Sequence, residues 1–349
     1  MRKNIKIVSL GRGYVLNGEE IYIQSMLKKP AGDVDGNVKQ AKLLEDSGCQ
    51  IIRVALPTIE SVKLIKVLKN SVSCPIVADI HFNYKIAIEA VKQGADKIRI
   101  NPGNMTKKEE LKSIVDVCRA FKVPIRIGVN SGSIEKSLLE VYGFASVDAM
   151  VQSALNSVKM FEDCFDFSNL VVSIKSSRVA DTVSACRKFR SLCSYPLHIG
   201  VTEAGLKEFS VVKSAIGIGA LLLDGIGETL RVSITGSPLQ EVRIGKLILK
   251  ALNISKKGVN IISCPTCGRT KIDILKLTND VQKRLENCNK NINVAIMGCV
   301  VNGPGEAKEA DIGIAGGDGC AVLFKKGKIC AKLDERYIVN ALLSEIENM

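Results

Sequence analysis

The sequence predicts a (β/α)8 barrel, the TIM-barrel class of α/β fold, followed by a smaller α/β domain. Short runs rich in β-branched residues alternate with amphipathic segments eight times before residue 255, and roughly 250 residues is the usual size of such a barrel. A helix after every strand favours parallel pairing with right-handed crossovers. Lys256-Lys257-Gly258 is typical of a linker. We therefore expect the barrel at 1–254, the linker at 255–258 and the second domain at 259–349.

The barrel elements follow from hydrophobic period and turn residues, taken in chain order. Residues 5–20 contain Gly11-Arg12-Gly13 and Asn17-Gly18, which favour a hairpin ahead of the barrel. The expected strands are 21–26, 50–55, 75–81, 97–102, 124–130, 170–176, 196–203 and 229–234. The expected helices are 34–47, 58–71, 83–93, 107–122, 146–163, 179–194, 207–223 and 238–253. A doubly wound open sheet is the alternative, but no G-x-G-x-x-G follows the first strand.

The second domain has a shorter pattern of the same kind. Its expected elements are a strand at 259–263, a helix near 271–287, strands at 292–297 and 311–315, a hairpin at 320–332 and a terminal helix at 334–347. This pattern predicts a small α/β domain.

Composition limits the classes of function. No apolar run reaches the ~18 residues that a membrane span needs, and the basic start lacks the apolar core of a secretory signal. We therefore expect a cytoplasmic protein. Twelve cysteines in 349 residues are too sparse for a disulfide scaffold. The net charge of +13 fits an anionic ligand or an acidic partner, whereas nucleic acid is not expected, because no Lys/Arg run or RNA-binding signature is present.

Cations are expected to converge at the carboxyl ends of the barrel strands, where barrel chemistry takes place. Five strands end near a cation: Arg53, Arg99, Arg126, Lys175 and Arg231. Asp79, Glu203, Asp224 and Glu228 offer partial counter-charge. Because buried charges need partners, the surplus predicts a phosphate or diphosphate site, for which arginine is well suited. A structural lattice of salt bridges is the alternative.

Only two histidines are present, His81 and His198, both at strand ends. Strands three and seven are far apart in a barrel, so a metal site formed by these two residues with Asp79 is disfavoured. A general-acid role, hydrogen bonding or packing is expected instead.

Thiols in the second domain indicate a metal or iron–sulfur centre. Cys264 and Cys267 form C-x-x-C, Cys299 follows later, and Glu306 comes after a glycine-rich turn. A zinc ribbon needs a second C-x-x-C pair, and none is present. Three thiolates with a carboxylate would give one iron a weaker ligand. Structural zinc, or ligation by a fourth thiol from Cys288 or Cys320, are the alternatives.

Seven motifs, in order, resemble one family. They are VADIHF (77–82), RINPGN (99–104), IRIGVNSGS (125–133), HIGVTEAG (198–205), GIGETLRVS (225–233), SCPTCGRT (263–270) and MGCVVNGPGE (297–306). The chain is similar to the 4-hydroxy-3-methylbut-2-enyl diphosphate synthases of the methylerythritol phosphate route to isoprenoids, in their two-domain bacterial form. The resemblance implies reductive ring opening of 2-C-methyl-D-erythritol 2,4-cyclodiphosphate, with two electrons delivered through a [4Fe–4S] cluster.

The same resemblance implies roles for individual residues. The cluster ligands would be Cys264, Cys267, Cys299 and Glu306, with Glu306 giving way to substrate. The residues expected to hold the diphosphate are Arg53, Arg99, Arg126, Asn130, Lys175, Arg231 and Ser233. Asp79, Glu203 and Asn302 would lie near the reacting carbons, and Glu203 would handle a proton.

The resemblance also implies partners. The family is homodimeric, with the cluster domain of one subunit closing over the barrel of the other, and flavodoxin or ferredoxin supplies electrons. The competing functions are a phosphate-binding lyase or transferase of the pterin-synthase type with structural zinc, and a nucleic-acid-binding module.

Overall fold

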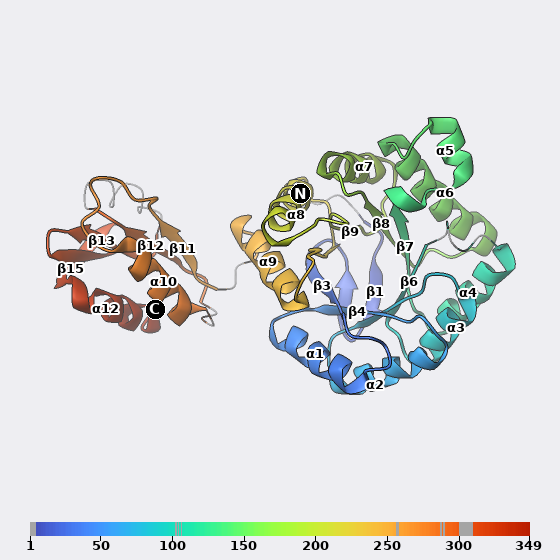
Figure 1. The fold of residues 1–349 in the computed structure, drawn as a ribbon, viewed down its shortest axis with the longest axis horizontal. Helices are drawn as coiled ribbons and strands as arrows, with labels where there is room; N and C mark the ends of the chain where they lie inside the picture. Colours follow the sequence, from blue (N-terminus) through green and yellow to red (C-terminus); the bar gives the residue numbers. More distant parts are fainter. Residues whose placement is uncertain are drawn as a thin grey trace. The chain divides into compact units, whose positions relative to one another are not determined.

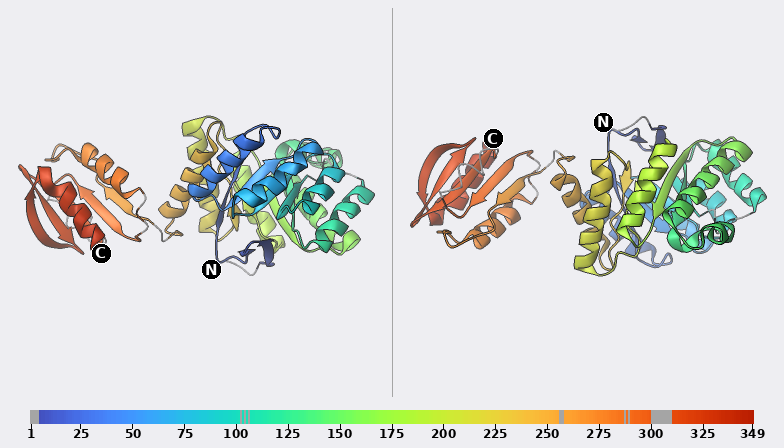
Figure 2. Two further views of the ribbon diagram at one scale, coloured as in Figure 1. Left: turned by 90° about the horizontal axis from the view of Figure 1, so that it is seen from below. Right: turned by 90° about the horizontal axis from the view of Figure 1, so that it is seen from above.

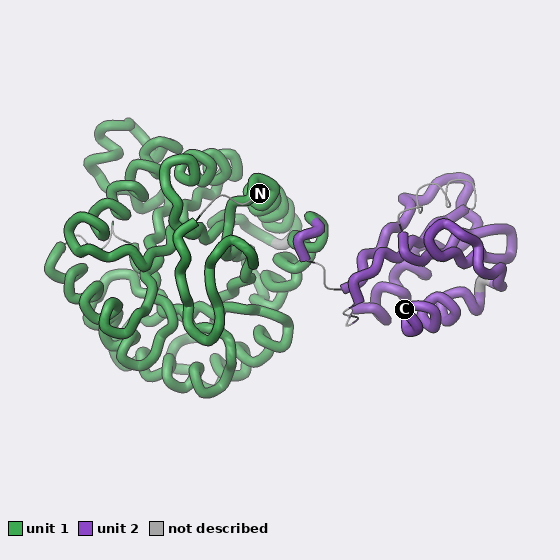
Figure 3. The backbone as a smooth tube through the Cα atoms, turned by 180° about the vertical axis from the view of Figure 1, so that it is seen from behind, with its two compact units in different colours: residues 1–252 green, residues 253–349 purple. Residues whose placement is uncertain are grey.

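The computed structural model describes residues 5–101, 103, 105, 107–255, 258–286, 288, 290–299 and 310–349. The chain divides into two compact units, 1–252 and 253–349, drawn in two colours in Figure 3. Each unit has its own apolar clusters, and no cluster contains residues of both. The two units are therefore described separately.

The first unit is the expected barrel. Its eight strands are β3 (Tyr22–Met26), β4 (Ile51–Ala55), β5 (Ile76–Asp79), β6 (Lys97–Ile100), β7 (Ile125–Asn130), β8 (Leu170–Lys175), β9 (His198–Ile199) and β10 (Thr229–Leu230). All pair in parallel, in the order β8-β7-β6-β5-β4-β3-β10-β9. A parallel bridge between Val172 and Leu197 joins the two ends of this order. The barrel prediction is confirmed, and the open-sheet alternative is wrong.

Helices surround the strands (Figure 1). They are α1 (Val34–Asp46), α2 (Lys63–Ser71, after the 3-10 turn Glu60–Val62), α3 (Tyr84–Lys92), α4 (Lys108–Ala120), α6 (Val147–Phe165), α7 (Val179–Leu192), α8 (Lys207–Leu223) and α9 (Pro238–Ala251). Four of them begin at a residue whose side chain accepts a hydrogen bond from a first-turn amide: Asp33, Asn83, Ser146 and Ser237. The helix α5 (Lys136–Tyr142) and the turn Ser131–Ser133 were not predicted.

The last two barrel strands are shorter than predicted. Within the predicted ranges 196–203 and 229–234, the strands β9 and β10 have two residues each. At Gly200 the backbone of β9 comes so close to the carbonyl of Arg231 that a side chain would collide with it. Glu203 then has a positive φ of 51°. The chain therefore leaves the barrel wall early and turns into the loop before α8.

The alternation of side chains separates the two faces of the barrel wall. Residues such as Ile52, Ile98 and Ile127 pack under the helices in the main cluster. Four inward-facing residues, Tyr22, Ile51, Val77 and Val171, form a separate cluster with an N-terminal hairpin. That hairpin, β1 (Val8–Gly11) and β2 (Tyr14–Leu16), is confirmed and lies at one end of the barrel in both views of Figure 2.

The second unit is a five-stranded sheet with two helices. Its elements are β11 (Asn260–Ser263), α10 (Ile274–Leu285), β12 (Asn293–Met297), β13 (Ile312–Gly317), β14 (Cys320–Lys325), β15 (Lys328–Asp334) and α12 (Glu335–Glu347). The sheet order follows the sequence, parallel from β11 to β13 and antiparallel after that. Val281 and Ile338, from the two helices, join one apolar cluster with Ile296 from the sheet. Among the described residues of both units, no helix combines the length and apolar character needed to cross a bilayer.

Candidate active site

The pairing registers show how high along the barrel axis each inward-facing side chain lies. In a closed eight-stranded barrel, each level receives four side chains from alternate strands. The registers around this barrel generate three successive levels: Ile51, Lys97, Val171 and Thr229; then Gln24, Val77, Arg126 and His198; then Arg53, Arg99, Ser173 and Arg231. Arg231 follows β10 but stays in the ladder through its amide, which donates to Ile199 O at 3.0 Å. The cations therefore increase in number toward the carboxyl ends.

Asp79 holds two of the expected arginines. Arg53 Nη2 lies 2.7 Å from its Oδ2 and Arg99 Nη1 lies 3.3 Å from its Oδ1. His81 Nε2 is 3.0 Å from the same Oδ2. Burial alone would raise the pKa of Asp79, but Arg53, His81 and Arg99 outweigh it, so its pKa lies below the usual range. The two arginine contacts therefore favour the ionised form of Asp79.

Three further cations are buried without an acidic partner among the residues that the structure describes. Lys97 is fully buried, Arg126 is 1% exposed and Lys175 is 9% exposed. Burial lowers the pKa of each, and neighbouring cations lower it further. Arg126 Nε and Nη1 and Lys97 Nζ also have no hydrogen-bond partner in the described part of the chain. Such groups need an anion nearby, because a buried unpaired cation is costly.

Two glycines leave room for these cations. A Cβ at Gly128 would stand 2.7 Å from Arg99 Nε. A Cβ at Gly200 would stand 3.2 Å from Lys175 Nζ, besides colliding with the Arg231 carbonyl. Neither position can hold a larger residue unless a site cation moves.

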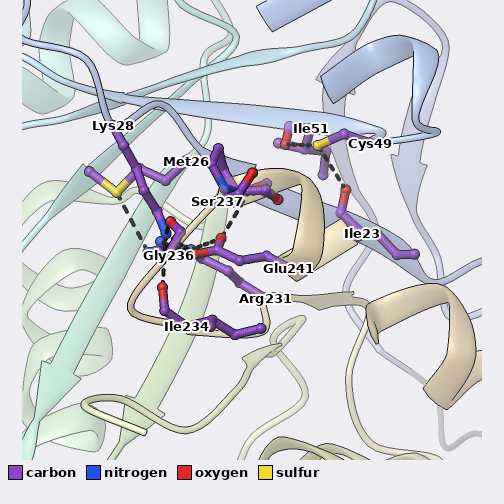
Figure 4. Close-up of polar contacts among 12 residues, drawn as sticks. Ile23, Met26, Lys28, Cys49, Ile51, Arg231, Ile234, Gly236, Ser237 and Glu241 are labelled. Carbon is purple, nitrogen blue, oxygen red and sulfur yellow. Dashed lines mark hydrogen bonds and ion pairs between the residues drawn. The ribbon is translucent and has the colours of Figure 1, made fainter. Parts of the chain in front are cut away.

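The remaining barrel residues have varied surroundings. Asn130 ends β7 and Ser233 follows β10, and both are half-buried. Glu203 is exposed in the loop after β9. Arg231 is held by the buried carboxylate of Glu241 (Figure 4). The structure thus brings Arg53, Arg99 and Asp79 into direct contact, whereas Glu203 makes no hydrogen bond or ion pair with them.

The two histidines do not combine into a metal site. His198 is fully buried, and its Nδ1 lies 2.8 Å from Thr229 Oγ1. Burial, followed by Lys175 and Arg126, lowers the pKa of His198 well below its usual value, which keeps the ring neutral. Within the described ranges, no group of three His, Cys, Asp or Glu side chains is arranged to hold a metal ion.

The three cysteines expected to bind the cluster, Cys264, Cys267 and Cys299, come from the loops that follow β11 and β12. β11 and β12 are parallel neighbours, so the loops after Ser263 and Met297 leave the sheet side by side. Gly298 N donates to Cys264 Sγ at 3.3 Å, and Lys271 N donates to Gly298 O at 2.9 Å. These bonds place Cys264 against the residue that precedes Cys299.

Cys267 lies in the turn between these contacts. Its amide donates to Thr270 Oγ1 at 3.1 Å, and Thr266 before it has a positive φ of 67°. A hydrogen bond from the Arg269 backbone lowers the pKa of the exposed Cys267 thiol. A lowered thiol pKa favours the thiolate, which is the metal-binding form. Glu306 and Asn302 lie outside the described residues.

Comparison with known proteins identifies the family. Residues 5–246 match the GcpE TIM-barrel domain, and residues 260–348 match the GcpE protein C-terminal domain. The chain belongs to the GcpE family. A relative from Caldicellulosiruptor saccharolyticus is 52% identical, over 100% of this chain and 99% of its own length. One from Caldanaerobacter subterraneus subsp. tengcongensis is 50% identical, over 100% and 98%. Both are named 4-hydroxy-3-methylbut-2-en-1-yl diphosphate synthase (flavodoxin), which confirms the resemblance seen in the motifs.

Two solved structures resemble this GcpE chain over about seven-tenths of its length. Dihydropteroate synthase from Yersinia pestis superposes with a TM-score of 0.52 at 12% identity, over 71% of this chain and 98% of that one. 3-Dehydroquinate dehydratase from Geobacillus kaustophilus gives 0.52 at 14% identity, over 72% and 99%. At such identities the likeness concerns the fold and does not favour a pterin-type transferase.

Sequence reasoning missed three polar residues of this GcpE barrel. Lys97 precedes Arg99 by two positions on the same strand, so the alternation rule alone could have placed it in the lumen. Gln24 is fully buried, and neither of its amide atoms has a partner in the part of the chain that the structure describes; its place two residues after Tyr22 on β3 carries the same signal. Glu241 carries none, because it belongs to a helix and reaches Arg231 only through the tertiary fold.

Proposed function

We propose that this chain is a 4-hydroxy-3-methylbut-2-enyl diphosphate synthase. Its substrate is 2-C-methyl-D-erythritol 2,4-cyclodiphosphate. Two electrons and two protons enter, a ring C–O bond opens, and one hydroxyl leaves as water. The observation that carries the proposal is the surplus of buried cations inside the barrel: Lys97 at the first level, Arg126 at the second and Lys175 at the carboxyl end of β8. The chain around them matches named synthases from end to end.

The diphosphate would supply the missing negative charge. Its expected contacts are Arg53, Arg99, Arg126, Asn130, Lys175, Arg231 and Ser233. The guanidinium groups offer paired donors to phosphate oxygens, and Lys175 offers a point charge. Arg53 and Arg99 are already oriented by Asp79. Binding a dianionic or more highly charged group here relieves the repulsion among the cations, which favours the complex.

Different carboxylates pair with the arginines and handle the proton in this proposal. Asp79 is tied to two arginines and stays ionised, so it orients the site. We assign the proton-handling role to Glu203, which is exposed and makes no ion pair among the described residues. We place Asn302 near the reacting carbons together with Asp79 and Glu203; Asn302 lies outside the described residues.

The donor set of the second unit fits an iron–sulfur cluster. Cys264, Cys267 and Cys299 would hold it, with Glu306 as the fourth ligand. Soft thiolates on two neighbouring loops suit iron or zinc, and the hydrogen bond from Gly298 to Cys264 Sγ is typical of the donors that surround cluster sulfurs. When bound, the cluster supplies electrons and a Lewis-acidic iron.

Partners and compartment follow from the family. We propose flavodoxin as the electron donor, in line with the relatives' names, and a homodimer in which the cluster domain of one subunit serves the barrel of the other. All twelve cysteines are unpaired, which suits a reducing cytoplasm.

Metal analysis of anaerobically purified protein tests this proposal. We expect a brown protein with about four iron and four sulfide per chain, and product formed from the cyclodiphosphate with reduced flavodoxin. Replacing Cys267 by Ser should lower the iron content and abolish turnover, whereas the same change at the exposed Cys164 should leave both unchanged. A colourless protein with one zinc per chain would instead support the lyase or transferase with structural zinc.

A further inference from the structure

A single buried carboxylate organises the cations at the end of β10. Glu241 lies in the first turn of α9 and is 1% exposed. Its Oε2 accepts from Arg231 Nε at 3.1 Å and from Ser25 Oγ at 2.9 Å. Its Oε1 accepts from Arg231 Nη2 at 3.2 Å and lies 2.9 Å from Lys28 Nζ. Both oxygens are therefore doubly engaged (Figure 4).

We propose that Glu241 is a positioning residue that orients Arg231 toward the substrate diphosphate. We also propose that Lys28 holds the loop after β10 in place. The inference rests on the proposed function, because it assumes that Arg231 binds the diphosphate. It adds two residues, one on a helix and one in a loop, that none of the site motifs contains.

Glu241 fixes the direction of Arg231 through two parallel contacts. A guanidinium is planar, so engaging Nε and Nη2 sets the plane and leaves Nη1 pointing away from the carboxylate. The only partner of Nη1 among the described residues is Met26 Sδ at 3.5 Å, a weak acceptor. Since Met26 is an inward-facing residue of β3, this corner of the guanidinium faces the lumen and remains available to a phosphate oxygen.

Lys28 acts on the loop and not on the ligand. Its Nζ donates to Ile234 O at 2.8 Å and to Gly236 O at 2.7 Å, and its third donor faces Glu241. An ammonium group has three donors, so none remains for a phosphate. Lys28 follows β3, whereas Ile234 and Gly236 follow β10. The lysine therefore ties together two neighbouring loops at the mouth, one of which carries Ser233.

The positioning role and simple electrostatics predict effects of opposite sign. Glu241 contributes a negative charge beside an anion site, so removing that charge should tighten diphosphate binding if only the local potential mattered. If Glu241 acts by orientation, removing it frees the Arg231 side chain to rotate and weakens binding, despite the more positive site. The sign of the change therefore separates the two explanations.

The test uses the intact enzyme, anaerobic and without reductant, so that the cyclodiphosphate binds but does not react. We expect Glu241→Gln to raise the dissociation constant measured by calorimetry at least tenfold. Glutamine keeps the size of the side chain, but its single carbonyl oxygen cannot accept from both Arg231 nitrogens. Lys28→Met should give a smaller rise, because the Arg231–Glu241 pair remains. An unchanged or lower dissociation constant in Glu241→Gln would overturn the inference.

A double-mutant comparison separates a specific effect through Arg231 from a general loss of folded structure. If Glu241 works through Arg231, Glu241→Gln should have no further effect on binding in an Arg231→Met background. The matched control is Glu228→Gln, which removes another buried carboxylate paired with an arginine, Arg190, at 3.0 Å. It should lower stability without changing the dissociation constant. If Arg231→Met binds the cyclodiphosphate normally, the proposed diphosphate site is wrong. If Arg231→Met weakens binding but Glu241→Gln does not, the diphosphate site is supported and the positioning role of Glu241 is wrong.

Discussion

At the residue scale, the site is defined by how few carboxylates serve its cations. Asp79 is shared by Arg53 and Arg99, and Glu241 is shared by Arg231 and Lys28. Sharing orients four cations with two charges and leaves the lumen positive. Buried pairs of this kind contribute little net stability, but they hold side chains in one geometry. The cations without a carboxylate partner among the described residues extend from Lys97 at the start of β6 to Lys175 at the end of β8, and they provide the attraction for an anion.

The surplus of buried positive charge can be tested at Lys97 by measuring the free energy of unfolding. Burial lowers its pKa in the folded protein, whereas in the unfolded chain it titrates near ~10.4. Between these two values the unfolded state binds more protons, so stability rises with pH. We expect Lys97→Met to stabilise the barrel by about 1–4 kcal/mol near neutral pH. The variant should also lose the rise in stability toward pH 10. Urea unfolding monitored across that range measures both.

The control for Lys97 is an exposed lysine of the same unit. Lys66→Met, on the outer face of α2, should change stability by less than about 0.5 kcal/mol and leave the pH dependence intact. A loss of stability in Lys97→Met would mean that its charge has a stabilising partner.

At the element scale, the two ends of the barrel have opposite roles. The hairpin β1–β2 covers the amino ends of the strands with Val8, Leu10 and Leu16. Arg12 at its turn donates to the carbonyl oxygens of Lys69 and Val72, which anchors the hairpin to the end of α2. Most of the cations lie toward the carboxyl ends, where Arg53, Arg99 and Arg231 share one level and Lys175 ends β8. The amino ends of the strands thus contribute mainly to stability, whereas the proposed site lies at the carboxyl ends, as is usual for this fold.

This division predicts a mutation that affects stability alone. Leu10 is 1% exposed, and Leu10→Ala should cost about 2–5 kcal/mol through lost burial and the cavity it leaves. The Michaelis constant for the cyclodiphosphate should stay the same at a temperature where the variant is folded. Ile7→Ala is the control, since Ile7 is 73% exposed on the same segment. A raised Michaelis constant in Leu10→Ala would show that the two ends are coupled.

At the scale of the whole molecule, binding and redox residues belong to different units. Every expected diphosphate contact lies within residues 1–252, and every expected cluster ligand lies within 253–349. Each unit has its own apolar core.

Mixing two inactive variants tests the proposed homodimer. Arg126→Met should lack substrate binding, and Cys267→Ser should lack an intact cluster. If the cluster domain of one subunit serves the other's barrel, a mixed dimer contains one site with both functional halves. Co-expression should then restore up to about half of the activity per dimer, by the symmetry of the closed pair. Activity no greater than that of the separate variants would contradict the exchange between subunits.

Several features could be predicted from local pattern alone. Hydrophobic period placed nearly every element within a few residues, because period and turn chemistry are properties of neighbouring residues. The alternation of strand residues placed Arg99 and Arg126 on the inner face for the same reason. Two predictions differed from the structure. β9 and β10 are shorter than expected, and the backbone leaves the barrel wall after Gly200, which lies against the Arg231 carbonyl. The helix α5, between β7 and α6, was not expected.

The sequence by itself determined the barrel, the second domain and the family, and it supplied the candidate residues for an anion site and a metal centre. Only the tertiary structure decided which charges are paired. Asp79 takes Arg53 and Arg99, and Glu241 takes Arg231 and Lys28, whereas Arg126, Lys175 and Lys97 have no carboxylate among the described residues. The reason is distance along the chain: Lys28 and Glu241 meet only once the barrel closes and brings β10 beside β3. Ion pairs depend on a few ångströms of space, which no local pattern specifies.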